Sequence, residues 1–430
     1  MTPYPAYKPT DLPWVPKIPE SWNLIKNKYL LRTREEVSQT GSEILLSLSQ
    51  YTGITAKNIS SGRLAESLIG YKIVHKNDIV MNIMLAWNGS TAMSDLDGIV
   101  SPAYAVFSVG EHVSPKFMHY LFKTPQMLQY FKSFSSGVIE SRLRLYPDEL
   151  AKLFSVVPPP DEQAQIVRYL DSMTAKINKL IRAKKRICDL IFEEIIQRAN
   201  EHINNKHLTR YRLKNILKLV AHEITRDNDM LYTPVGVLNR GRGIFHKKQL
   251  LGKDLGDSIF FHVFPGDMIF SGQFAWEGAV AILQKSEEGC IASHRYPLAR
   301  AIDPDFLRLA YLWAFFQTKY GDMLLNIHSH GAAGRNRPLN IARLLGETVP
   351  IPSLEEQKKI EKLFLQLQEA QKLAVNYSDK LQEYKNSMIA TIVTGQVDIR
   401  NIPVDDFDPA DLVSEAPDDP EEDATEESEE

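Results

Sequence analysis

Two long stretches of the chain repeat apolar residues at alternating spacings of three and four. The first follows "VPPPDEQAQI" (Val157–Ile166) and has apolar seam positions at Ile166, Leu170, Met173, Ile177, Leu180, Ile187 and Ile191, with Lys184 on the same seam. The second follows "IPSLEEQKKI" (Ile351–Ile360) and continues through Ile360, Leu363, Leu367, Ala370, Ala374, Tyr377, Leu381, Tyr384 and Met388. This spacing is typical of a coiled-coil seam, and a proline followed by acidic residues is typical of a helix start. We predict two long helices, over residues 158–203 and 352–395.

The order of the segments predicts how these helices pair. The first helix leads into a compact segment and the second leaves it, and a domain of this size usually holds its two ends close together. Helices of roughly 40 residues, about 60 Å long at 1.5 Å per residue, should therefore pack antiparallel. The alternative is two unrelated amphipathic helices in separate cores.

The segments outside the helices are two copies of one layout. "NDIVMNIMLAWNGS" (Asn77–Ser90) aligns with "GDMIFSGQFAWEGA" (Gly266–Ala279), and at the same offset Trp22, Leu24 and Leu30 align with Tyr211, Leu213 and Leu219. Nearer the helices, the difference in residue number between equivalent positions of the two copies is larger, and it pairs Gln163 with Gln357. Short β-rich runs precede helical stretches in each copy. We predict an α+β fold with two similar mixed α/β domains, residues 21–157 and 204–351, joined by two helices in an antiparallel coiled coil with pseudo-two-fold symmetry.

Composition indicates the character of the N-terminal segment and the cellular compartment of the protein. The chain has 430 residues, of which 43% are hydrophobic, and it is too long for one ordinary core. Residues 1–20 contain six prolines and are expected to form an extended arm. No apolar stretch approaches the roughly 18 residues of a membrane span. The two cysteines, Cys188 and Cys290, fit a reducing compartment, so we expect a cytoplasmic protein with no membrane partner.

Charge is distributed unevenly along the chain. The net charge of −4 combines 54 acidic and 50 basic residues, but 14 of the acids follow Arg400, where there is no Lys or Arg. Residues 396–430 are therefore predicted to be an acidic disordered tail, which adds solubility or competes for a basic surface. The remaining body carries ten more basic than acidic residues, which favours a polyanionic partner such as DNA.

The sequence contains no complete enzyme motif. "GAAGRNRP" (Gly331–Pro338) lacks the lysine of a phosphate-binding loop, and "HEITR" (His222–Arg226) has an arginine where a zinc protease needs histidine. His328 and His330 lack a nearby cysteine or carboxylate that would complete a metal site. We predict no catalytic, cofactor-binding or metal-binding residues in this chain.

Four glycine-containing loops, two in each half, are the candidate DNA-binding sites. Arginine forks suit phosphates and guanine edges. The loops at Leu48–Ser60 and Leu238–Leu250 differ strongly in chemistry, so if both read bases they should read different ones. The alternative for each residue is an ordinary solvated position, and Trp87 and Trp276 are expected to lie in the cores. The candidates are Gln50, Tyr51, Thr52, Lys57, Arg142, Arg144, Arg240, Arg242, Lys247, Lys248, Arg335 and Arg337.

These features together resemble the DNA-specificity subunit of type I restriction–modification systems. The resemblance runs from about Lys17 to Arg400 and is carried by "IPESW" (Ile18–Trp22), "PPPDEQAQI" (Pro158–Ile166), "IPSLEEQKKI" and "TGQVDIR" (Thr394–Arg400). The first half departs from the pattern, because "EEIIQRANEHI" (Glu193–Ile203) stands where a second TGQVD-like ending would be.

The resemblance implies a non-catalytic subunit that reads a two-part site in double-stranded DNA, one part per domain, with the helices setting the gap. It also implies two methylation subunits that carry S-adenosylmethionine, and restriction subunits that use ATP and Mg. One alternative is a two-headed protein-interaction scaffold that does not read DNA sequence. Another is a self-sufficient nuclease or methyltransferase with a degenerate motif.

Overall fold

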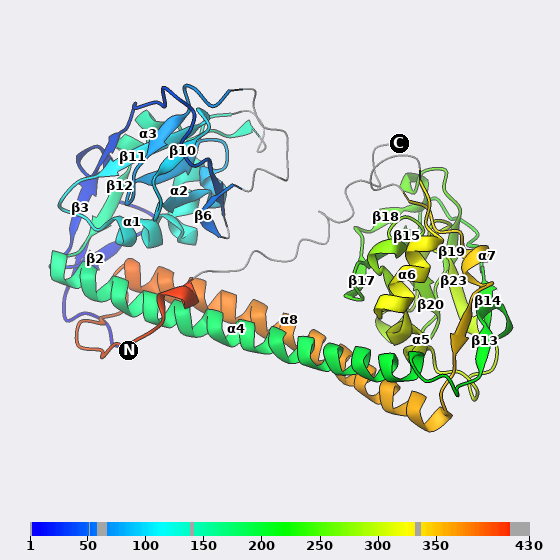
Figure 1. Cartoon of the computed structure of the whole chain (residues 1–430). Coiled ribbons are helices and arrows are strands. Elements are labelled where there is room, and N and C mark those ends of the chain that lie inside the picture. The colour runs from blue at the N-terminus through cyan, green and yellow to red at the C-terminus, as the bar shows by residue number, and fades with distance from the viewer. Residues whose placement is uncertain (1, 51, 58–66, 138–141, 332–336, 413–430) are drawn as a thin grey trace. The chain divides into compact units, whose positions relative to one another are not determined.

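The computed structural model describes residues 2–50, 52–57, 67–137, 142–331 and 337–412 (Figure 1). The chain divides into two compact units. Unit 1 comprises Met1–Ala183 and Val375–Pro417, and unit 2 comprises Lys184–Ala374 and Asp418–Glu430. Two long helices, α4 (Pro160–Ile203) and α8 (Leu354–Val393), each contribute one part to each unit.

Unit 1 is built around a four-stranded antiparallel sheet in the order β4-β11-β8-β9. Its strands are β4 (Leu31–Thr33), β11 (Tyr104–Val109), β8 (Ile79–Asn82) and β9 (Thr91–Met93). Four further antiparallel pairs surround it: β1 (Tyr7–Pro9) with β2 (Lys17–Pro19), β3 (Asn23–Lys26) with β12 (Phe154–Val157), β5 (Leu46–Ser49) with β6 (Gly53–Ala56), and β7 (Lys72–Val74) with β10 (Gly98–Val100).

Both faces of this sheet are covered, because successive strand residues point to opposite faces. Ile79 and Met81 pack into the core formed with α1 (Pro115–Phe122), α2 (Pro125–Phe134) and α3 (Pro147–Lys152). Val80, between them, packs instead with residues of β5, β7 and β10. The continuous apolar run of β8 therefore follows from burial on two sides.

Unit 2 repeats this layout. Its sheet has the order β14-β23-β20-β21, from β14 (Leu217–Val220), β23 (Leu298–Ala301), β20 (Met268–Phe270) and β21 (Val280–Ile282). The accompanying pairs are β13 (Arg210–Arg212) with β24 (Thr348–Pro350), β15 (Leu231–Tyr232) with β18 (Leu250–Leu251), β16 (Val235–Leu238) with β17 (Gly243–His246), and β19 (Phe260–His262) with β22 (Ile291–Ser293). The α+β prediction is therefore confirmed.

The helices of unit 2 are α5 (Leu309–Phe316), α6 (Lys319–Ile327) and the short α7 (Ile341–Leu344). α5, "LAYLWAFF", is apolar on all sides because it lies inside the core, where every residue after Leu309 is buried. None of the helices in the described ranges has the length and apolarity that crossing a membrane requires.

The duplication extends to individual elements, with one correction to the alignment. α1 and α5 begin at Pro115 and Leu309, which are as far apart in sequence as Gln163 and Gln357. The 3-10 helices η2 (Ala86–Asn88) and η6 (Ala275–Glu277) keep the offset that aligns Asn77 with Gly266. At the start of each unit, however, η1 (Asn27–Tyr29) and η4 (Leu213–Asn215) correspond at a shorter offset than either.

Backbone hydrogen bonds support this shorter offset. Asn27 N donates to Leu153 O at 2.8 Å, and Leu213 N donates to Glu347 O at 2.9 Å. Leu30, 2% exposed, therefore corresponds to Ile216 and not to Leu219, which is 47% exposed. The predicted alignment of Trp22, Leu24 and Leu30 with the second copy was therefore wrong in register. Similar apolar residues recur at neighbouring positions of these short segments, so the sequence alone allows more than one register.

Within each unit the segments of α4 and α8 run antiparallel, as predicted (Figure 1). In unit 2, His202 near the end of α4 lies 4.0 Å from Glu356 at the start of α8. The ring of Trp313 contacts both Phe192, which lies earlier on α4, and Phe364, which lies further along α8. As α4 advances, its neighbours on α8 therefore lie closer to the start of α8.

The middle of the predicted seam is not buried. Leu180 and Ile187 of α4 are 46% and 47% exposed, and Tyr377 and Tyr384 of α8 are 43% and 51% exposed. Burial is concentrated where the helices also contact an α/β core, as at Ile166 and Leu367. A pair of helices buries only the stripe that each turns to its partner, so apolar positions beside that stripe stay exposed.

Both chain ends differ from expectation. Val15 and Ile18 are buried in the core of unit 1, and β1 pairs with β2, so residues 2–20 are part of the domain and not a separate arm. The prediction of disorder is wrong for residues 396–412, which we term the C-terminal strap. Ser172 Oγ donates to Asp405 O at 3.0 Å, and Lys176 pairs with the Asp405 carboxylate at 2.5 Å.

The strap folds because its acids have basic partners and its apolar residues have a core. Ile399 is fully buried, and Gln165 Nε2 donates to Ile402 O at 2.8 Å. Arg182 on α4 pairs with Asp411. The rest of the predicted tail, residues 413–430, lies outside the described residues.

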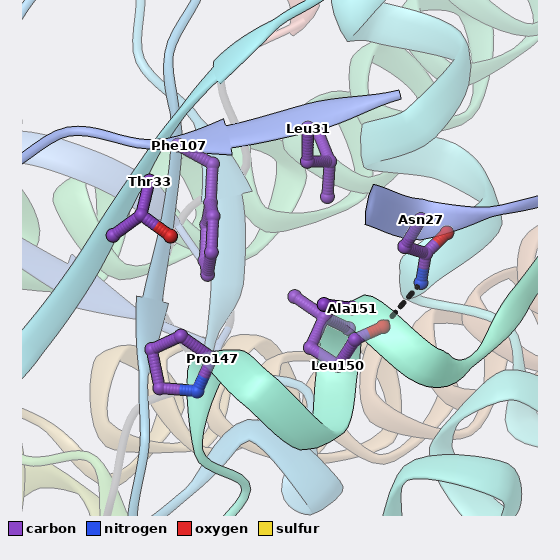
Figure 2. A pocket seen from close by; sticks show the side chains of 7 residues that line it. All are labelled: Asn27, Leu31, Thr33, Phe107, Pro147, Leu150 and Ala151. Carbon is purple, nitrogen blue, oxygen red and sulfur yellow. Dashed lines mark hydrogen bonds between the residues drawn. The ribbon is translucent and has the colours of Figure 1, made fainter. Parts of the chain in front are cut away.

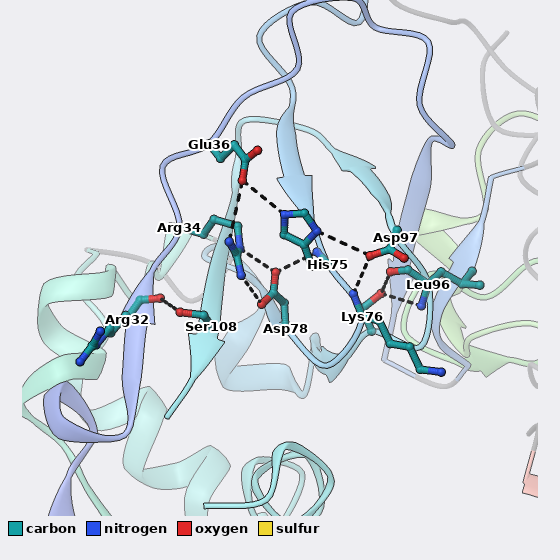
Figure 3. Close-up of polar contacts among 10 residues, drawn as sticks. Arg32, Arg34, Glu36, His75, Lys76, Asp78, Leu96, Asp97 and Ser108 are labelled. Atoms are coloured by element: carbon teal, nitrogen blue, oxygen red, sulfur yellow. Dashed lines mark hydrogen bonds and ion pairs between the residues drawn. The ribbon is translucent and has the colours of Figure 1, made fainter. Parts of the chain in front are cut away.

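A bidentate ion pair fixes the start of a central strand in each unit. In unit 1, Arg34 Nε and Nη2 donate to Asp78 Oδ2 and Oδ1 at 2.8 and 3.0 Å, and His75 N also donates to Asp78 (Figure 3). In unit 2, Arg300 makes the same two bonds to Asp267 at 2.6 and 2.8 Å. The aspartates occupy equivalent positions, whereas Arg34 follows β4 and Arg300 lies on β23. The ion pair is therefore kept although the arginine comes from a different place in the unit.

Candidate nucleic-acid interface

One buried glutamine fixes the start of each long helix to the adjoining α/β core. In unit 1, Gln163 Oε1 accepts a hydrogen bond from Ser114 N, the N-cap of α1, at 2.6 Å. Gln163 Nε2 donates to His112 O at 3.1 Å and to Pro158 O at 2.9 Å. All three bonds go to backbone groups beside a helix start. One of them gives a partner to an N–H group at the start of α1, where the helix itself supplies none.

Gln357 makes the same three contacts in unit 2. Its Oε1 accepts from Arg308 N, the N-cap of α5, at 2.8 Å, and its Nε2 donates to Phe306 O and Pro352 O at 3.1 and 3.0 Å. The repeated Glu-Gln phrase is therefore explained by structure: the glutamine aligns each long helix with the scaffold that carries the candidate loops.

In unit 2, η6 holds the turn of the β16–β17 hairpin. Arg240 N donates to Glu277 O at 2.9 Å, and Gly241 N donates to Gly278 O at 3.1 Å. Arg240 has a positive φ of 54° and is exposed. Arg242 turns back onto the same hairpin, with its Nε donating to Asn239 O at 3.2 Å. The hairpin turn thus has a fixed position, and Arg240 extends from it into solvent.

A second candidate loop reaches the same 3-10 helix. The guanidinium of Arg337 lies 4.7 Å from the ring centroid of Trp276, and Leu339 N donates to Gly272 O at 2.7 Å. Trp276 is itself fixed by an Nε1 bond to Gln273 O at 3.0 Å. The structure therefore brings Arg240, Arg242 and Arg337 to η6, and we call these three residues the unit 2 arginine cluster.

The other candidates of unit 2 are not brought to this cluster. Lys247 and Lys248 follow β17, where Lys247 Nζ lies 5.8 Å from the Tyr296 ring centroid and Lys248 is exposed. Arg335 lies outside the described residues. The hairpin therefore carries its basic residues at two places, its turn and the end of its second strand.

In unit 1, the candidate hairpin turn is held by a different residue. Gln50 and Thr52 are half-buried in the turn between β5 and β6, and Lys123 Nζ donates to Gln50 O at 2.9 Å. Lys57 follows β6 and is exposed, whereas Tyr51 lies outside the described residues. Lys123 is the C-cap of α1, so this helix fixes the turn.

The second candidate loop of unit 1 is closed by a small antiparallel bridge. Ser136 and Arg144 exchange backbone hydrogen bonds of 3.0 and 2.9 Å, and Leu145 N donates to Ile83 O at 2.8 Å. Arg142 and Arg144 are both candidates on this loop, and Arg142 is exposed. The loop therefore presents Arg142 and Arg144 close to the end of β8.

The two tryptophans of the repeated turns are not core residues, contrary to expectation. Trp87 and Trp276 are partly exposed, and each has a cation over its ring: Lys132 lies 5.1 Å from the Trp87 ring centroid, and Arg337 covers Trp276. The sequence feature that could have indicated this exposure is the shared "AW-x-G" turn. Its glycines, Gly89 and Gly278, have φ values of 91° and 73°, which are typical of a tight turn with the tryptophan beside it. A tryptophan with an exposed face can contact a ligand.

Two small cavities lie among the described residues, one in each unit. One, lined by Asn27, Leu31, Thr33, Phe107, Pro147, Leu150 and Ala151, has a volume of about 20 Å³ (Figure 2). Another, beside Gly241 and Trp313 in unit 2, also has a volume of about 20 Å³. Each has room for about one water molecule, whereas sites for small-molecule ligands usually measure about 300–1,000 Å³.

Metal-ligating side chains are dispersed in the part of the chain that the structure describes. No group of three His, Cys, Asp or Glu side chains gathers there as a metal site would require. The candidate residues that do gather are basic and aromatic. Their arrangement suits contact with phosphates and bases.

Comparisons with known proteins agree with this fold. No protein-family model matches the chain, and no curated protein matches its sequence. A solved structure described as the structural basis of complex assembly and conformational transition of the type I R-M system is 13% identical, with a TM-score of 0.56, over 88% of this chain and 99% of that chain.

Two further solved structures have a TM-score of 0.42. They are the HsdS subunit from Thermoanaerobacter tengcongensis, 13% identical over 88% of this chain and 98% of that chain, and the type I restriction-modification system S subunit from M. genitalium, 11% identical over 88% and 96%. The first of the three structures, with its TM-score of 0.56, shares the fold of this chain. This chain therefore has the fold of a chain from the type I R-M system.

Proposed function

We propose that this chain is the non-catalytic specificity subunit of a type I restriction–modification system. In this role it reads a bipartite site in double-stranded DNA, one half with each α/β domain, and the two long helices set the spacing between the half-sites. It assembles methylation subunits, which bring S-adenosylmethionine, and restriction subunits, which bring ATP and Mg.

The observation that carries this proposal is one scaffold with two different sets of loop residues. Gln163 and Gln357 make the same three bonds in the two units, so the scaffolds are alike. The equivalent hairpin turns differ: unit 1 presents Gln50 and Thr52, and unit 2 presents Arg240. Two similar frames with different recognition residues are what reading two different half-sites requires.

The proposed assembly is supported by apolar side chains that remain exposed on the long helices. In each unit the long helices leave large apolar side chains exposed, and such side chains are candidates for contact with protein partners. We call this set the exposed helix residues: Leu180, Ile187 and Leu190 on α4, and Leu365, Leu373, Val375, Tyr377 and Tyr384 on α8.

Exchange of one recognition domain tests the function directly. Residues 21–157 are replaced with the matching domain of a related specificity subunit, the complex with methylation subunits is assembled, and the methylated adenines are mapped. We expect one half of the recognised sequence to change and the other half to stay. A change in both halves, or in neither, would contradict the proposal.

The salt dependence of DNA binding separates this function from that of a protein scaffold. A complex that neutralises several phosphates loses affinity steeply as salt rises, with a slope of about −0.9 per phosphate in a log–log plot. The scaffold alternative predicts no sequence-selective DNA binding at any salt concentration. Activity of the purified chain alone would favour the self-sufficient enzyme.

A further inference from the structure

The C-terminal strap lies along one face of α4 within unit 1 (Figure 1). Ser172 Oγ donates to Asp405 O at 3.0 Å, and Asn178 Nδ2 donates to Asp411 O at 3.0 Å. These two residues of α4 are only 2% and 5% exposed. The strap therefore covers this face as a bound peptide would, through its backbone carbonyl groups.

The strap has a firmly held half and a loosely held half. Ile399 is buried in the core of unit 1, and Val404 is the last strap residue that packs against this core. None of residues 405–412, which we call the acidic half, is buried. In its ion pair with Lys176, the Asp405 side chain is 75% exposed and that of Lys176 is 47% exposed, and such pairs contribute little to stability. A segment with few buried apolar contacts opens at low free-energy cost, so the acidic half can leave α4 while the first half stays.

The face beneath the acidic half is basic. Arg168, Lys179 and Arg182 lie on one side of α4, since steps of three and four residues connect them, and Lys176 lies beside them. We call these four residues the α4 stripe. Arg182 pairs with Asp411, but Arg168 and Lys179 are exposed and have no ion pair with a described acid. The strap therefore neutralises only part of the positive charge of the stripe.

The second copy lacks most of this stripe. In the alignment that pairs Gln163 with Gln357, three of the four basic residues have uncharged equivalents on α8. These equivalents are Ala370, Leu373 and Asn376, for Lys176, Lys179 and Arg182 respectively. The equivalent of the buried Ser172 is Gln366, which is exposed. The scaffold itself therefore requires neither the stripe nor a cover over it, and the two occur together on α4.

We propose that the α4 stripe is a binding site for the phosphate backbone of double-stranded DNA, and that the acidic half of the strap covers the stripe until DNA displaces it. The carboxylates of Asp405 and Asp411 take the places of phosphate oxygens, since both kinds of oxygen are anionic acceptors for lysine and arginine. The space that the acidic half occupies is the space that the DNA backbone would take. The ligand class rests on the proposed function, whereas the site does not require that the chain reads a sequence.

Binding of the full chain to short double-stranded DNA of unrelated sequence tests the cover, with fluorescence anisotropy as the measurement. Asp405→Asn removes the partner of Lys176 but keeps the backbone bond from Ser172. It should tighten binding about three- to fivefold at low salt, which corresponds to the contribution of one exposed ion pair. Asp406→Asn is the matched control, because it removes the same charge from an exposed neighbour that has no ion pair with a described cation. Equal affinities of the two variants would overturn the cover.

The salt dependence of the same binding tests the stripe. Lys179→Gln should weaken binding and reduce the slope of log affinity against log salt by about 0.9, the value for one phosphate contact. Lys372→Gln removes an exposed lysine from α8 and should leave the slope as it is in the wild type. A wild-type slope in Lys179→Gln would show that the stripe does not bind phosphates.

Hydrogen exchange followed by mass spectrometry reports whether the strap leaves α4. Saturating DNA should speed amide exchange in residues 405–412 and leave residues 397–402 unchanged, because only the acidic half lacks contacts with the core. A strap with a purely structural role would exchange equally fast with and without DNA, and this result would overturn the proposal. Faster exchange caused by methylation subunits and not by DNA would overturn it as well, and would assign the covered face to a protein partner.

The outcomes separate this inference from the proposed function. Release of the acidic half by DNA of any sequence, without selectivity for a bipartite site in the assembled complex, would overturn the proposed function and leave the stripe standing. Bipartite reading without release of the acidic half would overturn the stripe and leave the proposed function standing.

Discussion

Asp78 and Arg34 form a bidentate ion pair in which only the arginine keeps contact with water. The Asp78 side chain is 4% exposed and that of Arg34 is 25% exposed. The two partners are therefore not equivalent, since loss of the arginine leaves a buried carboxylate whereas loss of the aspartate leaves a partly hydrated guanidinium. The Asp267–Arg300 pair of unit 2 has the same asymmetry, with 2% and 39% exposure.

We predict that Arg34→Met destabilises the chain by about 3–5 kcal/mol, the usual cost of an unpaired buried charge. Asp78→Asn should cost only about 1–3 kcal/mol, because the amide can still accept a hydrogen bond. Urea unfolding measures both values, and the double variant should recover part of the loss. Arg32→Met is the control, because Arg32 is an exposed arginine on β4, two residues before Arg34. Equal costs for the two single variants would contradict this explanation.

The glutamine that starts each long helix should be important for stability. Gln357→Ala leaves Arg308 N, Phe306 O and Pro352 O without their bonds, so we expect a loss of about 2–3 kcal/mol. Gln357→Glu should not rescue stability, because a carboxylate cannot donate to the two carbonyls. Gln366→Ala, at an exposed position on the same helix, should change stability by less than about 0.5 kcal/mol. Thermal unfolding of the three variants gives the comparison.

The sequence predicted the larger features and missed those that depend on local register. The long helices follow from apolar spacing alone, and the equivalence of Gln163 and Gln357 follows from a repeated phrase. The equivalence of Leu30 with Ile216 did not, because short strands tolerate a shift in the alignment that only the backbone hydrogen bonds reveal.

The candidate site shows the same division. Arginines in glycine loops were predicted from their chemistry, and the structure gathers Arg240 and Arg337 at one turn. The exposure of Trp276 was not predicted, because a large aromatic residue is usually buried and the sequence does not show that the turn places its ring beside Arg337. The strap was missed because composition hides the few contacts, such as Lys176 with Asp405, that order an acidic segment.

The lowered pKa of Lys123 predicts how stability depends on pH. In the unfolded chain this lysine has its ordinary pKa of 10.5, whereas in the folded chain burial and then Lys385 lower the pKa to about 8. Between these values the unfolded state binds more protons than the folded state, so stability should rise as pH increases from about 8 to about 10. In Lys123→Gln this contribution is absent. The melting temperature of the wild type relative to the variant should therefore rise over this range, and a constant difference would contradict the prediction.

The exposed helix residues predict the site of partner binding. Leu373 is 57% exposed, so Leu373→Lys should leave stability within about 0.5 kcal/mol of the wild type. If a methylation subunit covers this position, burying a lysine there should weaken the complex at least about tenfold, as changes at interface centres do. Titration calorimetry with the methylation subunit measures the change. Glu369→Lys, an exposed position on the same helix, adds a lysine without removing an apolar contact and should have a much smaller effect.

The contact of Arg337 with Trp276 predicts a test of DNA reading by unit 2. Because Trp276 holds the guanidinium 4.7 Å from its ring, Arg337 is already oriented in the chain by itself. Arg337→Ala should reduce affinity for the site by about 1–3 kcal/mol if the fork reads a base, and methylation mapping should show relaxed specificity in one half-site only. Arg337→Lys keeps the charge but not the fork, so it should restore the salt slope without restoring specificity. Arg343→Ala, an exposed arginine of α7, should leave the methylation pattern unchanged. Full activity and specificity in Arg337→Ala would exclude this residue from contact with DNA.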